Sequence, residues 1–186
     1  MTNRYTISTK PPTIIGLTGY AGSGKTLTAD LLVESYGAVK VSFSTALKEI
    51  ANDLPVVDRL IADWGPEQAK RDHAVVRETY QKLGEGVRRV LGEYTWVDHL
   101  ASRWNSPEGD LRDASLIVID DVRYPNEAAI CDWVLHVERD AVGPLNEHES
   151  EQGVSDLPVD LWIDNSGGLD DLREGIDLAM LLIGGE

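Results

Sequence analysis

Apolar and polar positions alternate along the chain in segments that predict strands and helices in turn. Short apolar or alternating runs are typical of strands, several of them buried, at 13–18, 39–43, 115–119, 133–138 and 161–163. Apolar residues at helical spacing predict helices at about 27–36, 45–50, 127–132 and 169–183, and most of 53–112 also reads as helical. Strands that alternate with helices indicate a three-layer α/β fold around a parallel sheet.

The organisation of these segments predicts one domain with an insertion. A chain of 186 residues is typical of a single domain. We expect a core formed by 13–52 and 113–186, and a helical insertion at 53–112 that extends over the strand ends, where such folds bind ligands. Glycines and prolines within 139–158 predict a mobile lid.

The segment GYAGSGKT, residues 19–26, lies between the first predicted strand and the first predicted helix. It fits the phosphate-binding pattern G-x-x-x-x-G-K-[ST], and its strand–loop–helix context aims backbone N–H groups at a polyphosphate. Lys25 is expected to reach the β- and γ-phosphates, and the Thr26 hydroxyl to bind Mg²⁺. The residues expected to contact the nucleotide are Gly19, Ala21, Gly22, Ser23, Gly24, Lys25 and Thr26.

Two acidic residues end the apolar strand at 115–119 and indicate a second part of the same site. Asp120 and Asp121 follow that strand, and a carboxylate there typically holds Mg²⁺ in proteins with this loop. Arg123 comes next, in a turn before Pro125, and Arg139 follows the strand at 133–138. Both arginines are candidates to place positive charge over a transferred phosphoryl group.

The charge of the chain limits the class of its partners. The formal net charge is −15, which argues against a nucleic-acid polymer as a ligand. Six of the 17 Lys and Arg residues nevertheless fall within 70–89, which suits a small phosphorylated molecule. The single cysteine, the polar segment 1–12 and the lack of a long apolar run predict a cytoplasmic protein with no membrane partner. A homodimer is compatible with the sequence.

One face of the helical insertion carries a candidate acceptor site. Arg77, Gln81, Gly84 and Arg88 lie within about 60° of one another on a helical wheel. Arginines on such a face could pair bidentately with a monophosphate, although a solvated helix face has the same composition. Trp96 could stack on a base, and it could equally be a core residue.

Beyond the phosphate-binding loop, the string IDDVRYPNEA and the downstream HESE resemble the deoxynucleoside monophosphate kinases of tailed bacteriophages. FSTALKEIA, RETYQKLGEGVRR and DLWIDNSGGLDDL extend the resemblance from about residue 13 to 175. The resemblance implies a nucleoside monophosphate kinase-like P-loop fold. It also implies deoxynucleotide biosynthesis, in the host-cell cytoplasm if the chain is of phage origin. ATP would give its γ-phosphoryl group to a deoxynucleoside monophosphate, with ADP and the diphosphate as products.

The resemblance also assigns expected roles to individual residues. Asp121 matches the family's metal-binding acid, with Asp120 as the alternative, and the alignment favours Arg89 where the wheel favours Arg88. Leu83-Gly84-Glu85-Gly86 stands where the family usually has L-G-T-E, which leaves base or sugar selectivity open. Lys48 is a further candidate contact with the acceptor. His148 and Glu151, within the predicted lid, could lie at the closed site or belong to a surface charge run. In similar kinases a turn like that at Asn165 borders the adenine of ATP, and here it could equally be a loop that starts the last helix.

Two other functions are compatible with the same motifs. A dephospho-coenzyme A or shikimate kinase would share the fold and the phosphate-binding loop but not the acceptor. An ATP-dependent switch protein would hydrolyse ATP slowly and need no acceptor. The chain has no N-K-x-D string of the kind that reads guanine.

Overall fold

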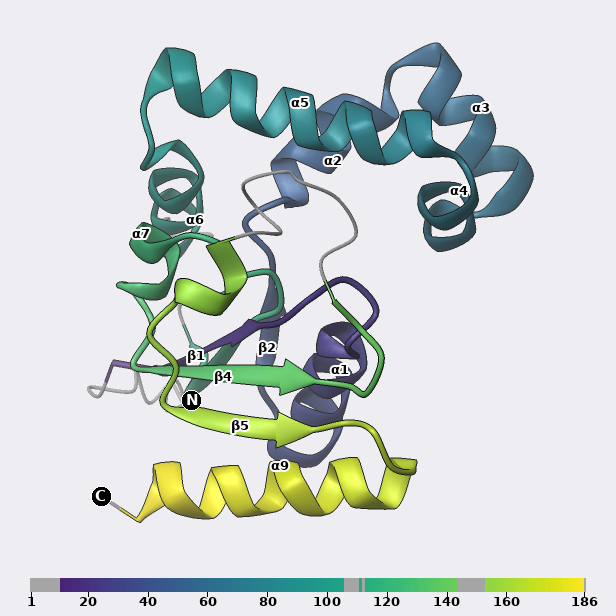
Figure 1. Cartoon of the computed structure of the whole chain (residues 1–186). Coiled ribbons are helices and arrows are strands. Elements are labelled where there is room, and N and C mark those ends of the chain that lie inside the picture. Colours follow the sequence, from purple (N-terminus) through teal and green to yellow (C-terminus); the bar gives the residue numbers. More distant parts are fainter. Residues whose placement is uncertain (1–10, 106–110, 112, 144–152, 186) are drawn as a thin grey trace, which may run out of the picture. The chain divides into compact units, whose positions relative to one another are not determined.

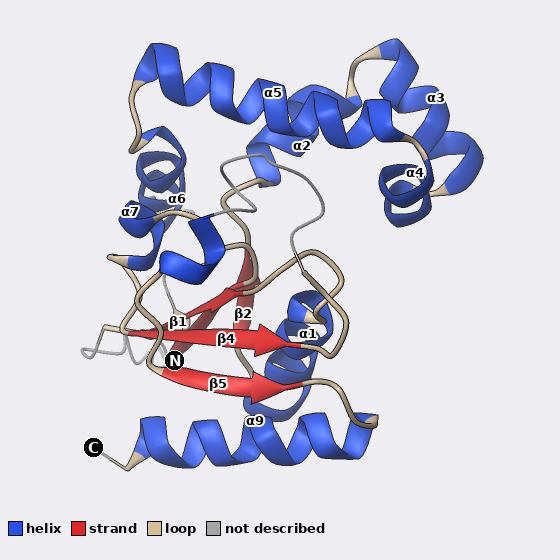
Figure 2. Ribbon diagram, in the orientation of Figure 1, coloured by secondary structure: helices blue, strands red, loops and turns tan. Residues whose placement is uncertain are grey.

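A five-stranded parallel sheet with flanking helices makes up one part of the chain, and a group of helices makes up another (Figures 1 and 2). This computed structural model describes residues 11–105, 111, 113–143 and 153–185. Its contacts divide the chain into two units. We call Met1–Ser42 with Ala101–Glu186 the sheet unit, and Phe43–Leu100 the helical unit.

The strands of the sheet unit lie in the order β2-β3-β1-β4-β5, all parallel. They are β1 Thr13–Thr18, β2 Val39–Val41, β3 Leu116–Ile119, β4 Trp133–Glu138 and β5 Leu161–Asp164. The other elements of this unit are α1 Lys25–Tyr36, α7 Pro125–Ala128, the 3₁₀ turn Gly153–Asp156 and α9 Leu169–Gly184. Five parallel strands with flanking helices confirm the predicted fold class.

The core of the sheet unit lies between the sheet and helices α1 and α9. Alternate residues of β1, Ile15 and Leu17, are fully buried there with Leu135 of β4 and Leu172 of α9. The intervening Gly16 faces the other way, and a Cβ on it would lie 2.8 Å from Val122 Cγ2. The buried apolar runs read from the sequence therefore form strands that are covered on both faces.

Two aspartates extend the hydrogen bonding at the amino end of the sheet. Asp132 Oδ2 accepts from Ile14 N at 2.8 Å, while Asp132 N donates to Ile14 O at 2.8 Å. Asp160 repeats the pattern with Val134, through its Oδ2 at 2.7 Å and its N–H at 2.9 Å. The starts of β1 and β4 are thus paired by carboxylates that directly precede the neighbouring strands.

The helical unit contains α2 Thr45–Asn52, α3 Pro55–Trp64, α4 Pro66–Asp72 and α5 Ala74–Leu91, and α6 Thr95–Asn105 begins in it. One small buried cluster of this unit consists of Val57, Ala69 and Val76. A hydrogen bond of 2.7 Å from Tyr80 Oη to Asn52 Oδ1 ties α5 to the end of α2. The unit overlaps the predicted insertion at 53–112, whose role in acceptor binding stays a prediction.

Several boundaries differ from the sequence-based expectations. The second strand ends at Val41 rather than 43, and the short helix expected at 127–132 spans Pro125–Ala128. Its start is set by Pro125, whose fixed φ and missing N–H suit the first helical position. None of the described helices combines the length and apolar character that a bilayer crossing needs.

Candidate active site

The phosphate-binding loop leaves the carboxyl end of β1 and enters α1, and glycines make its path sterically accessible. Gly19 has φ +135°, and a Cβ there would overlap the Val137 carbonyl oxygen. Gly24 has φ +107° and is the N-cap of α1, whose first turn contains no acidic residue. An α-helix N-terminus without acidic neighbours favours an anion through its unpaired N–H groups and its dipole.

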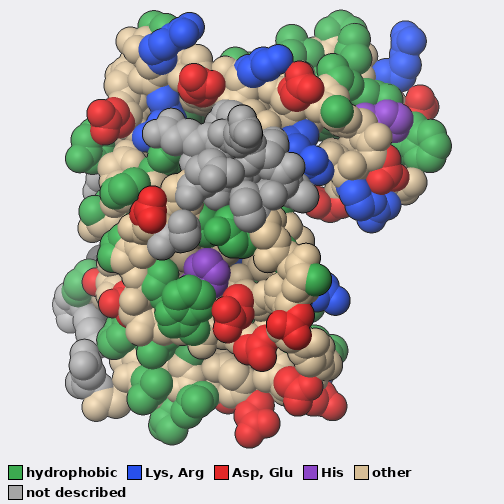
Figure 3. All heavy atoms as spheres, in the orientation of Figure 1, with side chains coloured by type: hydrophobic (Ala, Val, Ile, Leu, Met, Phe, Trp, Pro, Cys, Tyr) green, Lys and Arg blue, Asp and Glu red, His purple; other side chains and the backbone are tan. Residues whose placement is uncertain are grey.

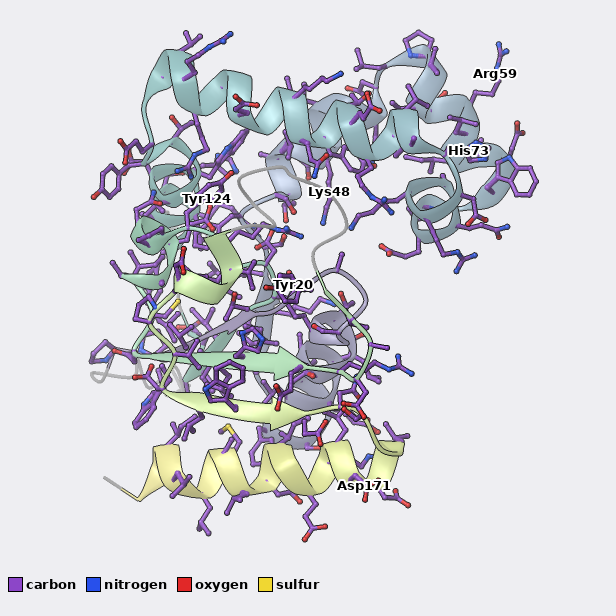
Figure 4. All side chains as sticks on the ribbon, in the orientation of Figure 1. Tyr20, Lys48, Arg59, His73, Tyr124 and Asp171 are labelled. Atoms are coloured by element: carbon purple, nitrogen blue, oxygen red, sulfur yellow. The ribbon has the colours of Figure 1, made fainter. Side chains whose placement is uncertain are left out.

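Lys25 lies at the start of α1 and turns back onto the loop. Its Nζ donates to Gly19 O at 2.7 Å and to Tyr20 O at 2.8 Å, and only 9% of the residue is exposed. The ammonium group is therefore held at the loop by two backbone carbonyls. Figure 4 labels Tyr20 in this loop. Thr26, the predicted metal ligand, is exposed on the first turn of the same helix.

The loop also receives a hydrogen bond from the turn after β5. Asn165 Nδ2 donates to Ser23 O at 2.8 Å, and Asn165 is 9% exposed. The sequence predicted that Asn165 borders the nucleotide, and the structure brings it to the phosphate-binding loop itself.

The two acids after β3 differ in their surroundings. Asp121 Oδ2 accepts a 2.6 Å hydrogen bond from Ser42 Oγ, at the end of the neighbouring strand β2. Asp120 Oδ2 lies 4.0 Å from Lys40 Nζ, and its backbone N–H donates to Val41 O at 3.2 Å. Ser42 thus orients the Asp121 carboxylate, and it is a residue that the sequence reasoning missed.

Arg123 follows Asp121 in a turn that a buried carboxylate organises. Glu127 is 3% exposed, and its Oε2 accepts from Arg123 N at 2.8 Å and from Tyr124 N at 3.2 Å. Val122 N donates to Leu17 O at 3.1 Å, which joins this turn to β1. The position of Arg123 is therefore fixed by its backbone. Glu127 was missed as a site-building residue, although an acid three residues into a helix is a recognisable capping signal.

His136 on β4 lies near the phosphate-binding loop. It is 5% exposed, and its ring packs on Trp162 at a centroid distance of 4.3 Å and edge-on to Tyr20 at 6.5 Å. Burial, and then the positive charge of Lys25, hold the pKa of His136 below its ordinary value. A neutral imidazole therefore adjoins the loop.

The remaining predicted residues of the sheet unit lie after β4. Arg139 is exposed directly after this strand, where Val142 N donates to its carbonyl at 3.1 Å. His148 and Glu151 lie outside the described residues, as does the middle of the predicted lid.

The helical unit carries the predicted acceptor-binding residues. Helix α5 continues through Gly84, whose Cα faces Leu47 of α2, since a Cβ there would lie 3.5 Å from Leu47 Cδ2. Arg77, on the same face, donates from Nη2 to Lys70 O at 3.3 Å. The exposure of the other candidates varies: Lys48, Gln81 and Arg88 are half-buried, Arg89 is exposed, and Trp96 is 8% exposed. Figure 4 labels Lys48 on α2, and Figure 3 shows Lys and Arg side chains over this unit.

Comparison with known proteins shows the fold but no family. No protein-family model and no curated protein sequence matches the chain. Among solved structures, TT1252 from Thermus thermophilus is 20% identical with a TM-score of 0.53, covering 94% of this chain and 99% of that one. Dephospho-CoA kinase from Campylobacter jejuni is 10% identical with a TM-score of 0.50, covering 92% and 98%. This chain therefore has the fold of a P-loop kinase.

Proposed function

We propose that this chain is an ATP-dependent kinase that transfers the γ-phosphoryl group of ATP to a deoxynucleoside monophosphate. One observation carries the proposal: the phosphate-binding loop holds Lys25 by hydrogen bonds to two of its carbonyls, in a chain whose sequence also has the DVRYPNE segment. ADP and a deoxynucleoside diphosphate would be the products. The fold supports a kinase, and the motifs support this acceptor.

The sheet unit supplies the groups that would bind ATP. Loop N–H groups and the α1 N-terminus would bind the phosphates, and Lys25 would move from the Gly19 and Tyr20 carbonyls to the β- and γ-oxygens. Mg²⁺, when bound, would neutralise charge on those oxygens, with Thr26 and Asp121 as its ligands. Ser42 would keep Asp121 in the orientation seen here.

Transfer itself would depend on position and charge. The acceptor phosphate is already anionic, so its attacking oxygen needs no general base, and alignment with the γ-phosphorus dominates the rate. Arg123 and Arg139 are the candidates to stabilise the transferred group, and Arg77 with Arg88 or Arg89 would bind the acceptor phosphate. The proposed reaction therefore needs no proton-transfer residue.

The deciding experiment measures ADP formation from MgATP with each of eight acceptors, namely dAMP, dCMP, dGMP, dTMP and the matching ribonucleotides. We expect at least one deoxynucleotide to raise turnover far above the rate without acceptor. Dephospho-coenzyme A and shikimate belong in the same panel because P-loop kinases use varied acceptors. Stimulation by one of these alone would replace the proposed acceptor, and turnover indifferent to every acceptor would favour the switch protein.

A further inference from the structure

We propose that Asn165 is a positioning residue for ATP binding, which acts by fixing the backbone of the phosphate-binding loop rather than by touching the base. This inference rests on the proposed nucleotide-dependent function. It gives the β5–α9 turn a task distinct from contact with adenine, because the side-chain amide is already engaged with the loop.

The amide joins two segments that are 142 residues apart in sequence. Its Nδ2 donates to Ser23 O at 2.8 Å in a buried position. The backbone of the same residue is fixed independently, since Asn165 N donates to Glu138 O at 2.8 Å at the end of β4. The side chain therefore extends from a fixed anchor, and it can hold the loop rather than follow it.

The geometry of the Ser23–Gly24 peptide links this hydrogen bond to phosphate binding. Carbonyl and N–H point in opposite directions across a trans peptide. Because Asn165 holds the Ser23 carbonyl, the N–H of Gly24 in the same peptide unit points away from the amide. Loop N–H groups that converge on one side are what binds phosphate in such loops. Asn165 thus sets the direction of one donor without approaching the ligand.

The Asn165 amide also packs closely against Gly24. A Cβ on Gly24 would overlap Asn165 Nδ2 and lie 3.2 Å from Asn165 Cγ. The amide therefore occupies the space beside the Gly24 Cα, at a residue with φ +107°. A glycine at position 24 is needed for its backbone conformation and for this contact, so both residues define one unit.

The same turn also contacts the segment that follows β4. Ser166 Oγ accepts from Asp140 N at 3.0 Å, and Ser166 N donates to Asp164 Oδ1 at 2.8 Å. The turn is thus anchored on both sides of Asn165, which makes its amide a fixed support for the loop.

The test compares Asn165→Ala and Asn165→Asp with wild type and with Asp170→Ala. Asp170 is fully exposed in the first turn of α9, so its variant controls for a change near the same turn. Binding of ATP and of ADP is measured by calorimetry with Mg²⁺, and thermal midpoints are recorded to keep the titrations below unfolding. The KM values for ATP and for the acceptor are measured in parallel.

We expect Asn165→Ala to weaken ATP and ADP binding by roughly tenfold, as for the loss of one orienting hydrogen bond. Asn165→Asp should be no better, since a carboxylate cannot donate to the Ser23 carbonyl. KM for ATP should rise with little change in KM for the acceptor, and Asp170→Ala should match wild type. A lowered thermal midpoint with ATP affinity within about twofold of wild type would overturn the proposal by showing a purely structural role.

A double-mutant cycle with Gly24→Ala gives an independent test. The new methyl group would overlap the amide, so the loss of ATP affinity caused by Gly24→Ala should be smaller in the Asn165→Ala background. Additive losses would contradict the contact. If wild type binds neither ATP nor ADP, the proposed function itself fails and takes this inference with it. If wild type binds ATP but phosphorylates no deoxynucleotide, only the acceptor assignment fails, and the binding data still decide the role of Asn165.

Discussion

The two units of this chain differ in how their side chains are held. The sheet unit has a buried apolar core built from four strands and two helices, and a buried hydrogen bond from Asn165 connects the turn after β5 to the phosphate-binding loop. In the helical unit, Val57, Ala69 and Val76 form a small buried cluster, against which Leu60, Ile61 and Tyr80 pack. Large apolar residues are exposed on both units, among them Val90 at 74% in the helical unit and Trp162 at 62% in the sheet unit, so the contrast lies in the buried clusters.

This difference fits the tasks that we propose for the two units. A phosphate-binding loop works by presenting donors that are already in place, whereas an element that receives an acceptor benefits from opening at low cost. The cluster described in the helical unit is smaller than that of the sheet unit, so we expect the local opening free energy of the helical unit to be lower. The predictions that follow test this contrast, beginning with the largest expected effect.

The largest effect is expected at Lys25. Lys25→Ala should lower turnover by roughly 10³-fold or more, because it removes the ammonium group that would stabilise the transferred phosphoryl group. The measurement is steady-state ADP formation, with circular dichroism to check that the variant is folded. Retention of most of the activity would remove Lys25 from the catalytic machinery.

Core substitutions should separate the two units in stability. Leu17→Ala should lower the global free energy of unfolding by about 3 kcal/mol, because Leu17 is fully buried in the core and its truncation would leave a cavity. Val57→Ala should mainly speed hydrogen exchange within 43–100. Hydrogen exchange followed by mass spectrometry reports both, and uniform protection across the two units would contradict the contrast.

The two acids after β3 should differ in their effect on metal dependence. Asp121→Asn should raise the Mg²⁺ concentration needed for half-maximal activity by at least about tenfold, because it removes a carboxylate ligand. Asp120→Asn is the matched control and should change this value less. The reverse order would assign the metal to Asp120, and Ser42→Ala should shift the Mg²⁺ dependence in the direction of Asp121→Asn.

In the helical unit, Arg77→Ala should raise the acceptor KM by roughly tenfold while the KM for ATP stays the same. Arg59→Ala is the control, since Arg59 is an exposed arginine on α3 of the same unit (Figure 4). Equal effects of the two substitutions would mean that Arg77 acts only through the overall positive charge of the unit.

The smallest effect concerns pH. The pKa of His136 is lowered in the folded chain, so its neutral form stabilises the fold above the ordinary pKa, and this contribution is lost as pH falls through the folded pKa. Urea unfolding should therefore show a steeper loss of stability below about pH 6.5 for wild type than for His136→Gln. Parallel pH profiles of wild type and His136→Gln would mean that folding does not lower the pKa of His136.

The comparison also shows which features a sequence reveals. Local signals predicted the strands and the loop, because the apolar runs and the G-x-x-x-x-G-K-T spacing act on adjacent residues. Ser42 and Asn165 contribute through hydrogen bonds to residues 79 and 142 positions away, and no local pattern encodes such partners. The helix at 125–128 begins two residues before the expected start at 127. A helix this short has too few apolar residues to show its period, whereas Pro125 and Glu127 define its start.

Asp132 and Asp160 have a consequence for how this fold can diversify. Both close the amino end of the sheet with side-chain hydrogen bonds, whereas the groups with proposed chemical roles follow the carboxyl ends of β1, β3 and β5. Substitutions at one end therefore need not disturb the other. A related chain could exchange the segments that follow the carboxyl ends of its strands and keep its scaffold, provided that the two aspartates stay in place.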